Sequence, residues 1–163
     1  MEKHKYSGKS KEEAIKKAQE ELQELESNLF IREISETKAG LFKSKKVEIE
    51  VIEKRDVVQH IKEYLIKILK SMGITANIEI KNKDDVPKYI IYSDNDGILI
   101  GKNGKNLKAL SMIVAQHLNT ELSRTYRFTI DVNDYQERRE KSLEHLAKRV
   151  AKEVSETKIE AKT

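Results

Sequence analysis

Two glycines, Gly101 and Gly104, constrain the fold of this chain more than any other feature of its sequence. They flank Lys102 and Asn103 and lie between two segments whose apolar residues recur with helical spacing. Glycine lets the backbone turn sharply without a steric penalty and lets another backbone approach closely. A glycine-bracketed turn between helices often does nothing but turn, so its meaning depends on the elements around it.

Residues 55–133 place this turn in a regular series of elements. Helical spacing predicts a helix that starts at about Asp56 and is ended by Gly73. Strands follow near 75–81 and 88–93, the second entered at Pro87, and then a short helix over about 94–100 and a longer one over about 104–119. Alternation over 126–132 indicates a last strand. The predicted order is α-β-β-α-α-β.

Two faces in this series are predicted in detail. The first helix should place one stripe inward, namely Val57, Ile61, Leu65, Ile68 and Met72. The last strand should place Tyr126, Phe128, Ile130 and Val132 on one side, and Arg127, Thr129 and Asp131 on the other.

The turn has the chemistry of a phosphate site. The helix that follows it presents N–H groups and a positive dipole end, lysines add charge, and apolar residues, including Leu99, offer a floor for unstacked bases. Two arginines near the last strand are further candidates, although a solvated strand face explains them equally well. The predicted binding residues are Ile98, Ile100, Gly101, Lys102, Asn103, Gly104, Lys105, Leu107, Lys108, Arg124 and Arg127.

Residues 1–54 indicate a separate small unit with the order β-α-β-β. A short strand over 3–6 ends at Gly8, and Ser10 with Glu13 forms a capping box that opens a helix. Its apolar face should contain Ile15, Ala18, Leu22 and Leu25. Strands are expected over about 29–36 and 46–52, joined by a turn that contains residues 38–42.

Residues 134–163 indicate one long helix, capped by Asn133 or Asp134. Its narrow apolar stripe, Leu143, Leu146, Val150 and Val154, must pack on the second unit, on another chain, or in a domain that continues past Thr163. We favour the last. Tyr135, Arg138 and Arg139 at its start suit either nucleic acid contacts or ordinary helix-start packing.

Composition excludes several classes of protein. The chain has no cysteine, so disulfides, thiolate chemistry and cysteine zinc sites are excluded, and a reducing compartment is expected. The net charge of +4 permits a polyanionic partner without demanding one. We find no secretory signal, no membrane-spanning run, no Walker loop and no clustered histidines or carboxylates. We therefore expect no catalytic residues, no metal site, no cofactor and no membrane insertion.

The α-β-β-α-α-β series with its Gly101-Lys102-Asn103-Gly104 turn resembles a type II KH domain, in which a GxxG turn clamps a nucleotide backbone. Residues 8–14 and 38–42 resemble the N-terminal domain of the Jag proteins, also called SpoIIIJ-associated or KhpB proteins. Residues 134–143 resemble the first helix of that family's third domain, which is named for an Arg-x-x-x-His motif. No such motif occurs in this sequence. The spacing is present at Lys141 and His145, but the first residue is lysine where the motif has arginine. The resemblance implies domains over 1–54, 55–133 and 134–163, the last incomplete.

The resemblance implies a fold of α+β class and a cytoplasmic single-stranded RNA-binding protein, an RNA chaperone or post-transcriptional regulator. It further implies a link to sporulation, cell-wall synthesis, cell shape, elongation and division in Gram-positive bacteria, and a smaller single-KH protein as partner. Two alternatives stay open. One is single-stranded DNA binding, and the other is a protein-interaction scaffold in which the KH unit mediates homodimerisation.

Overall fold

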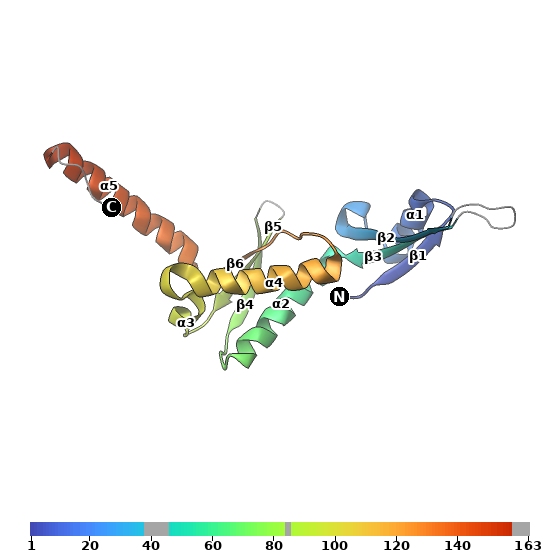
Figure 1. Cartoon of the computed structure of the whole chain (residues 1–163), viewed down its shortest axis with the longest axis horizontal. Helices are drawn as coiled ribbons and strands as arrows, with labels where there is room; N and C mark the ends of the chain where they lie inside the picture. Colours follow the sequence, from blue (N-terminus) through green and yellow to red (C-terminus); the bar gives the residue numbers. More distant parts are fainter. Residues whose placement is uncertain (38–45, 84–85, 158–163) are drawn as a thin grey trace. The chain divides into compact units, whose positions relative to one another are not determined.

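The computed structural model describes residues 1–37, 46–83 and 86–157 (Figure 1). The chain divides into two compact units. Residues 1–68 with 118–124 form unit 1, and residues 69–117 with 125–163 form unit 2. Both predicted element orders are confirmed, and the fold is α+β. The predicted turn at 38–42 lies outside the described residues.

Unit 1 begins with a three-stranded antiparallel sheet and one helix (Figure 1). Its elements are β1 (His4–Gly8), α1 (Lys11–Leu22), the short 3-10 helix η1 (Glu26–Asn28), β2 (Leu29–Thr37) and β3 (Lys46–Glu53), with β3 central in the sheet. Helix α1 contacts β1 and β3. The shared core consists of Tyr6, Ala14, Ile15, Ala18, Leu29, Val47, Ile49 and Val51.

The capping of α1 is confirmed at Ser10, whose Oγ accepts a hydrogen bond from Glu13 N at 3.3 Å. The Glu13 carboxylate reaches back to Lys9 N at 2.9 Å, one residue before the position expected of a capping box. The prediction that Leu25 lies on the helix face is wrong. Gln23 adopts a left-handed conformation that ends α1 at Leu22, and Leu25 is 69% exposed.

Strand β3 passes directly into α2 (Lys54–Ser71), so this helix starts two residues before the predicted Asp56. Its buried stripe is Val57, Ile61, Leu65 and Leu69. The prediction that Met72 belongs to the stripe is wrong, because the helix ends at Ser71 and Met72 is 50% exposed. Gly73, at φ +73°, ends the helix as expected, and Ile74 N bonds back to Leu69 O at 2.9 Å.

The end of helix α4 (Lys105–Leu122) and the residues that follow it belong to unit 1. Lys3 forms an ion pair with Glu121 at 3.6 Å, and Arg32 donates a hydrogen bond to Ser123 Oγ at 2.8 Å. The guanidinium of Arg124 lies 4.8 Å from the centre of the Phe30 ring. These contacts hold the end of α4 and the residues after it against β2 and against Lys3, the residue before β1.

Unit 2 is built around a second three-stranded sheet of β4 (Asn77–Lys83), β5 (Val86–Tyr92) and β6 (Thr129–Val132), in that order. Strands β4 and β5 are antiparallel, whereas β5 and β6 are parallel. Between β5 and β6 the chain forms α3 (Asp96–Ile100), the 3-10 turn η2 (Lys102–Gly104) and α4. The predicted last strand was too long, since pairing with β5 begins only at Thr129.

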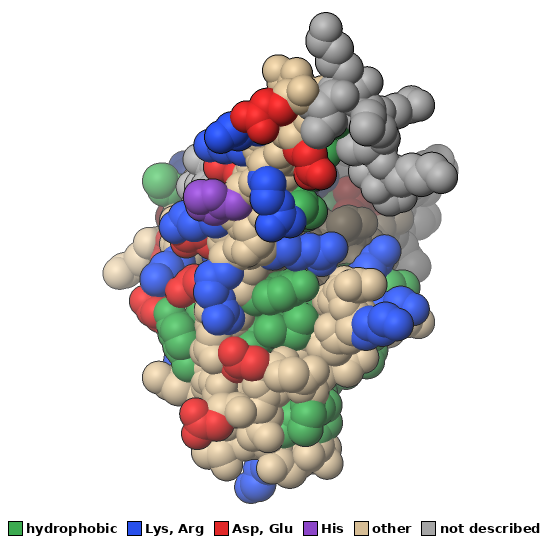
Figure 2. Space-filling view, turned by 90° about the vertical axis from the view of Figure 1, so that its left-hand side faces the viewer, with side chains coloured by type: hydrophobic (Ala, Val, Ile, Leu, Met, Phe, Trp, Pro, Cys, Tyr) green, Lys and Arg blue, Asp and Glu red, His purple; other side chains and the backbone are tan. Residues whose placement is uncertain are grey.

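Two residues separate the end of β6 from helix α5 (Tyr135–Thr157). Its apolar stripe remains largely uncovered within the described residues, with Leu143 and Leu146 at 54% and 44% exposure. Figure 2 views the molecule from the side on which α5 and α3 lie in Figure 1, and shows hydrophobic side chains there among Lys and Arg. The start of α5 must therefore be held by contacts other than this stripe.

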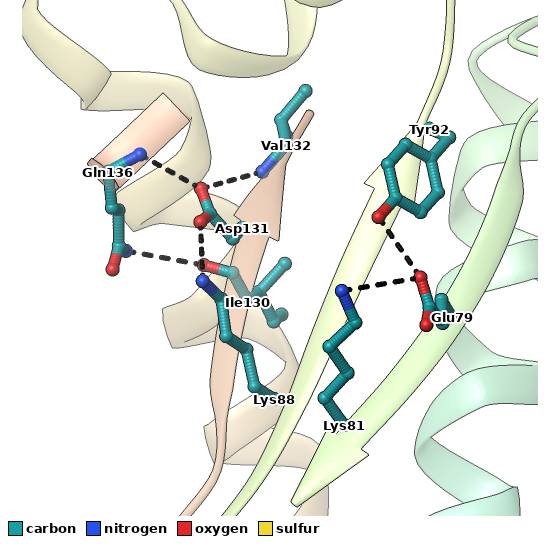
Figure 3. A network of polar contacts seen from close by, with 8 residues as sticks. All are labelled: Glu79, Lys81, Lys88, Tyr92, Ile130, Asp131, Val132 and Gln136. Atoms are coloured by element: carbon teal, nitrogen blue, oxygen red, sulfur yellow. Dashed lines mark hydrogen bonds and ion pairs between the residues drawn. The ribbon is translucent and has the colours of Figure 1, made fainter. Parts of the chain in front are cut away.

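A buried carboxylate provides those contacts (Figure 3). Asp131 on β6 is fully buried, although the strand pattern grouped it with Arg127 and Thr129 on the other side from the apolar residues. Its Oδ2 pairs with Lys88 Nζ on β5 at 2.9 Å, and its Oδ1 accepts from Gln136 N in the first turn of α5 at 3.2 Å. The hydrogen bond to Asp131 raises the pKa of the Lys88 amine. A buried charge is tolerated because these partners satisfy it, and they tie the helix to the sheet.

Replacing Lys88 with Met should lower the free energy of unfolding by about 3 kcal/mol, because it leaves the Asp131 carboxylate buried without a cation. The raised pKa of Lys88 means that this stabilisation is complete at neutral pH and is lost as the pH rises through that pKa. Urea unfolding followed by circular dichroism measures the change.

Lys81→Met is the matched control. Lys81, on the neighbouring strand, makes a single ion pair within the described part of the chain, an exposed one with Glu79 at 3.7 Å, and its loss should change stability by less than about 0.5 kcal/mol. Equal destabilisation by the two variants would contradict the assigned role of Lys88.

Candidate nucleic-acid interface

The turn between α3 and α4 has three of its four residues in left-handed backbone conformations. Gly101 adopts φ +68° and ψ 177°, Asn103 adopts φ +57°, and Gly104 adopts φ +79°. The region occupied by Gly101 is essentially restricted to glycine, and asparagine is one of the few other residues that enters the left-handed helical region readily. Hydrogen bonds from Gly104 N to Gly101 O and from Lys105 N to Lys102 O close the turn. The backbone therefore favours glycine at positions 101 and 104 and a residue such as asparagine at position 103.

Asn106, which the sequence prediction missed, braces this turn from the first residues of α4. Its Nδ2 donates a hydrogen bond to Ile98 O at 2.7 Å, across the turn from α4 to α3. A Cβ atom on Gly101 would lie only 2.6 Å from Asn106 Cγ. The amide side chain thus occupies the space that the missing side chain of Gly101 leaves open.

Lys102, Lys105 and Lys108 are exposed on the turn and on the first turn of α4. None of them forms an ion pair with a residue that the structure describes. Many other lysines of the chain are paired, for example Lys17 with Glu13 and Lys141 with Glu137. The turn therefore carries positive charge that is available to an anion.

Three pockets of about 500 Å³ each lie around the turn; residues of α3 and α5 line the first, and residues of α4 help to line the other two. The first lies beside Gly101 and Arg138, the second beside Gly104 and Leu107, and the third beside Met112 and Arg127. Tyr135 and Arg139 line both the first and the second, while Lys108 and Ser111 line both the second and the third. Neighbouring pockets thus share part of their lining, and we call the three together the α4 track, which extends from the turn to the start of β6.

The predicted apolar floor is only partly accessible. Leu99 and Leu107 are buried, at 2% and 5% exposure, although Leu107 still lines the second pocket. Ile98 is 54% exposed and Ile100 is half-buried in the wall of the first pocket. Met112, another residue that the sequence prediction missed, is 63% exposed and lines the third pocket. The surface open to a base is therefore spread over both helices.

The two predicted arginines lie in different units. Arg127 lines the third pocket with Lys108 in unit 2. Arg124 belongs to unit 1 and lies over the ring of Phe30, as described above. The structure thus brings Arg127, and not Arg124, into the track.

Neither a metal site nor a membrane-spanning segment emerges from the described residues. They contain no group of three or more His, Asp or Glu side chains placed to hold an ion. None of the helices in the described part of the chain combines the length and the apolar character that crossing a bilayer requires.

Replacing Gly101 with Ala should lower the free energy of unfolding by about 1–3 kcal/mol, because alanine is strained at this φ and ψ and its Cβ collides with Asn106. Gly97→Ala, four residues earlier in α3, is the control. No atom lies within 4 Å of its added Cβ, and alanine favours a helix by up to about 1 kcal/mol. Thermal unfolding by circular dichroism compares the two. A Gly101→Ala protein as stable as the Gly97→Ala protein would contradict the described turn.

Comparisons with known proteins agree with this geometry. The KH domain family matches residues 60–133, which include the turn, α3, α4 and all three strands of unit 2. A stretch of 64 residues is 36% identical to the small ribosomal subunit protein uS3 of Lachnoclostridium phytofermentans, and covers 39% of this chain and 29% of that protein.

Two relatives match nearly the whole chain. The RNA-binding protein KhpB of Clostridium symbiosum is 31% identical over 156 residues, which cover 93% of this chain and 70% of the relative. The RNA-binding protein KhpB of Bacillus subtilis is 27% identical over 155 residues, which cover 93% of this chain and 74% of the relative. With a KH domain built around its GxxG turn and relatives that match 93% of its length, the chain belongs to the KhpB family of RNA-binding proteins.

Proposed function

We propose that the chain binds single-stranded RNA along the α4 track, with the backbone phosphates held at the Gly101–Gly104 turn. The observation that carries this proposal is the cluster of exposed lysines at the turn, Lys102, Lys105 and Lys108, which are unpaired among the described residues. Phosphate contacts supply most of the affinity of such an interface, and they need cations that are not already neutralised. Membership of the KhpB family favours RNA as the ligand.

In this proposal about four unpaired nucleotides occupy the track. Lysines and backbone N–H groups at the turn bind phosphates, and the left-handed backbone leaves room for the sugar-phosphate chain to approach. Ile100 and Met112 contact base faces, and Arg127 binds a phosphate at the far end. The chain performs no chemical step and needs neither a cofactor nor a metal.

Family membership supports a finer role, which we propose with it. The protein acts in the cytoplasm as an RNA chaperone or post-transcriptional regulator in cell-wall homeostasis, cell elongation and division, together with a smaller single-KH protein. Residues 1–54 and 55–133 serve as the N-terminal and KH modules, and residues 134–163 begin a third nucleic-acid-binding domain.

A second candidate function is a scaffold that dimerises through the KH unit. It is favoured by the outer face of α4, where Met112 and Ile113 are 63% and 50% exposed. Exposed apolar side chains that neighbour each other mark surfaces used for association. Single-stranded DNA is the alternative ligand for the same track.

Replacing Lys102 and Asn103 together with Asp should weaken RNA binding by about tenfold or more, because a cationic turn becomes anionic. Asp is tolerated in the left-handed conformation nearly as well as Asn, so the backbone should survive the change. Fluorescence anisotropy with a labelled 12-nucleotide RNA, and with DNA of the same sequence, measures the loss.

The control is Lys16→Glu with Gln19→Glu on α1, which also turns one positive and one neutral side chain into two negative ones. It should leave affinity unchanged. Unchanged binding by the Lys102→Asp/Asn103→Asp protein would exclude the turn as the site. Loss of RNA binding with a dimer retained in analytical ultracentrifugation would exclude the scaffold as the function of this turn.

A further inference from the structure

We infer that the first turns of α5 form a second wall of the RNA site, in which Arg138 and Arg139 bind the phosphates that flank the nucleotide held at the turn. This inference rests on the proposed function and extends it to residues outside the α-β-β-α-α-β unit. The first pocket, about 520 Å³, lies between this wall and the Gly101 side of the turn.

Arg139 lies directly on the glycine turn. Its Nη1 donates hydrogen bonds to Asn103 O at 3.3 Å and to Tyr135 Oη at 3.4 Å. A Cβ on Gly104 would lie 3.6 Å from the same nitrogen, so the guanidinium covers the backbone of the turn closely. Its Nε and Nη2 make no hydrogen bond or ion pair within the described part of the chain. Arginine recognises phosphate through such a fork of donors, and here the fork lies beside the proposed phosphate position.

Arg138 lines the same pocket one residue earlier. It pairs with Asp96 at 3.7 Å, and the two side chains are 61% and 34% exposed. An exposed pair at this distance contributes little and is readily replaced by a stronger anion. Asp96 also accepts a hydrogen bond from Asn133, which keeps that carboxylate satisfied if Arg138 turns to a phosphate.

The wall is held in place by the sheet. Gln136 N binds the buried Asp131 carboxylate, and Gln136 Nε2 reaches Ile130 O at 3.5 Å (Figure 3). Arg138 N bonds to Asp134 O at 3.2 Å in the same turn. Since the first turn of α5 is fixed to β6, the two arginines are positioned before a ligand arrives, which lowers the entropic cost of binding.

A block of the turn by α5 is the competing interpretation, because Arg139 covers part of it. Charge argues against a block. The segment brings two guanidinium groups to the first pocket, and Glu140, which lines the second pocket, makes no ion pair with Lys108 among the described residues. A segment that excluded RNA by charge would pair carboxylates with the lysines of the turn. Those lysines stay exposed and unpaired among the residues described.

The test compares the full chain with its Arg138→Gln/Arg139→Gln variant in the anisotropy assay, over a range of salt concentrations. Loss of two phosphate contacts should weaken binding about tenfold and lower the slope of log K against log salt by about 1.4, at roughly 0.7 for each contact to a single strand. The Arg138→Lys/Arg139→Lys variant should restore most of the slope, because it keeps the charge. Lys11→Gln/Lys16→Gln on α1, which also removes two exposed positive charges, is the matched control and should change neither quantity.

The outcomes separate this inference from the function on which it rests. If the Lys102→Asp/Asn103→Asp protein loses binding while Arg138→Gln/Arg139→Gln behaves like Lys11→Gln/Lys16→Gln, the second wall is excluded and the turn site stands. Tighter binding by Arg138→Gln/Arg139→Gln would establish the block instead. An unaltered chain that binds neither RNA nor DNA would overturn both proposals.

Discussion

The backbone conformation of Gly101 is the constraint on which the nucleic-acid interface depends. At φ +68° and ψ 177° this residue reverses the chain between α3 and α4, a step that other residue types cannot make without strain. Asn106 fills the space beside it and joins the two helices. Because the turn is braced in this way, the lysines on it are presented to solvent at fixed positions, and the site needs no ligand to form it.

The buried ion pair of Asp131 and Lys88 fixes the position at which the C-terminal helix α5 starts. Asp131 forms an ion pair with Lys88 on β5 and accepts a hydrogen bond from Gln136 N on α5. One carboxylate therefore sets where the helix starts. The apolar stripe of α5, exposed at Leu143 and Leu146, cannot do this within the described residues. The start of α5 is therefore attached to the sheet by an ion pair and hydrogen bonds, whereas the other helices are attached by hydrophobic packing.

Periodicity predicted the elements well, because apolar spacing reports the face that each helix or strand buries. It failed where a local backbone conformation ended a helix early, or where a polar partner allowed a charged side chain to be buried. Gln23 ends α1 before Leu25, and the buried Asp131 sits on a strand pattern that grouped it with exposed residues. The glycine turn was visible in sequence, whereas the contact of Arg139 with Asn103 joins residues far apart in the chain and follows only from the fold.

Titration of the 15N-labelled chain with a single-stranded RNA, followed by NMR, tests the central claim most directly. We expect the largest amide shifts on residues 101–105 at the turn and on Tyr135–Arg139 at the start of α5, with smaller shifts along α4. Shifts confined to β1, α1, β2 and β3, with the turn unchanged, would contradict it.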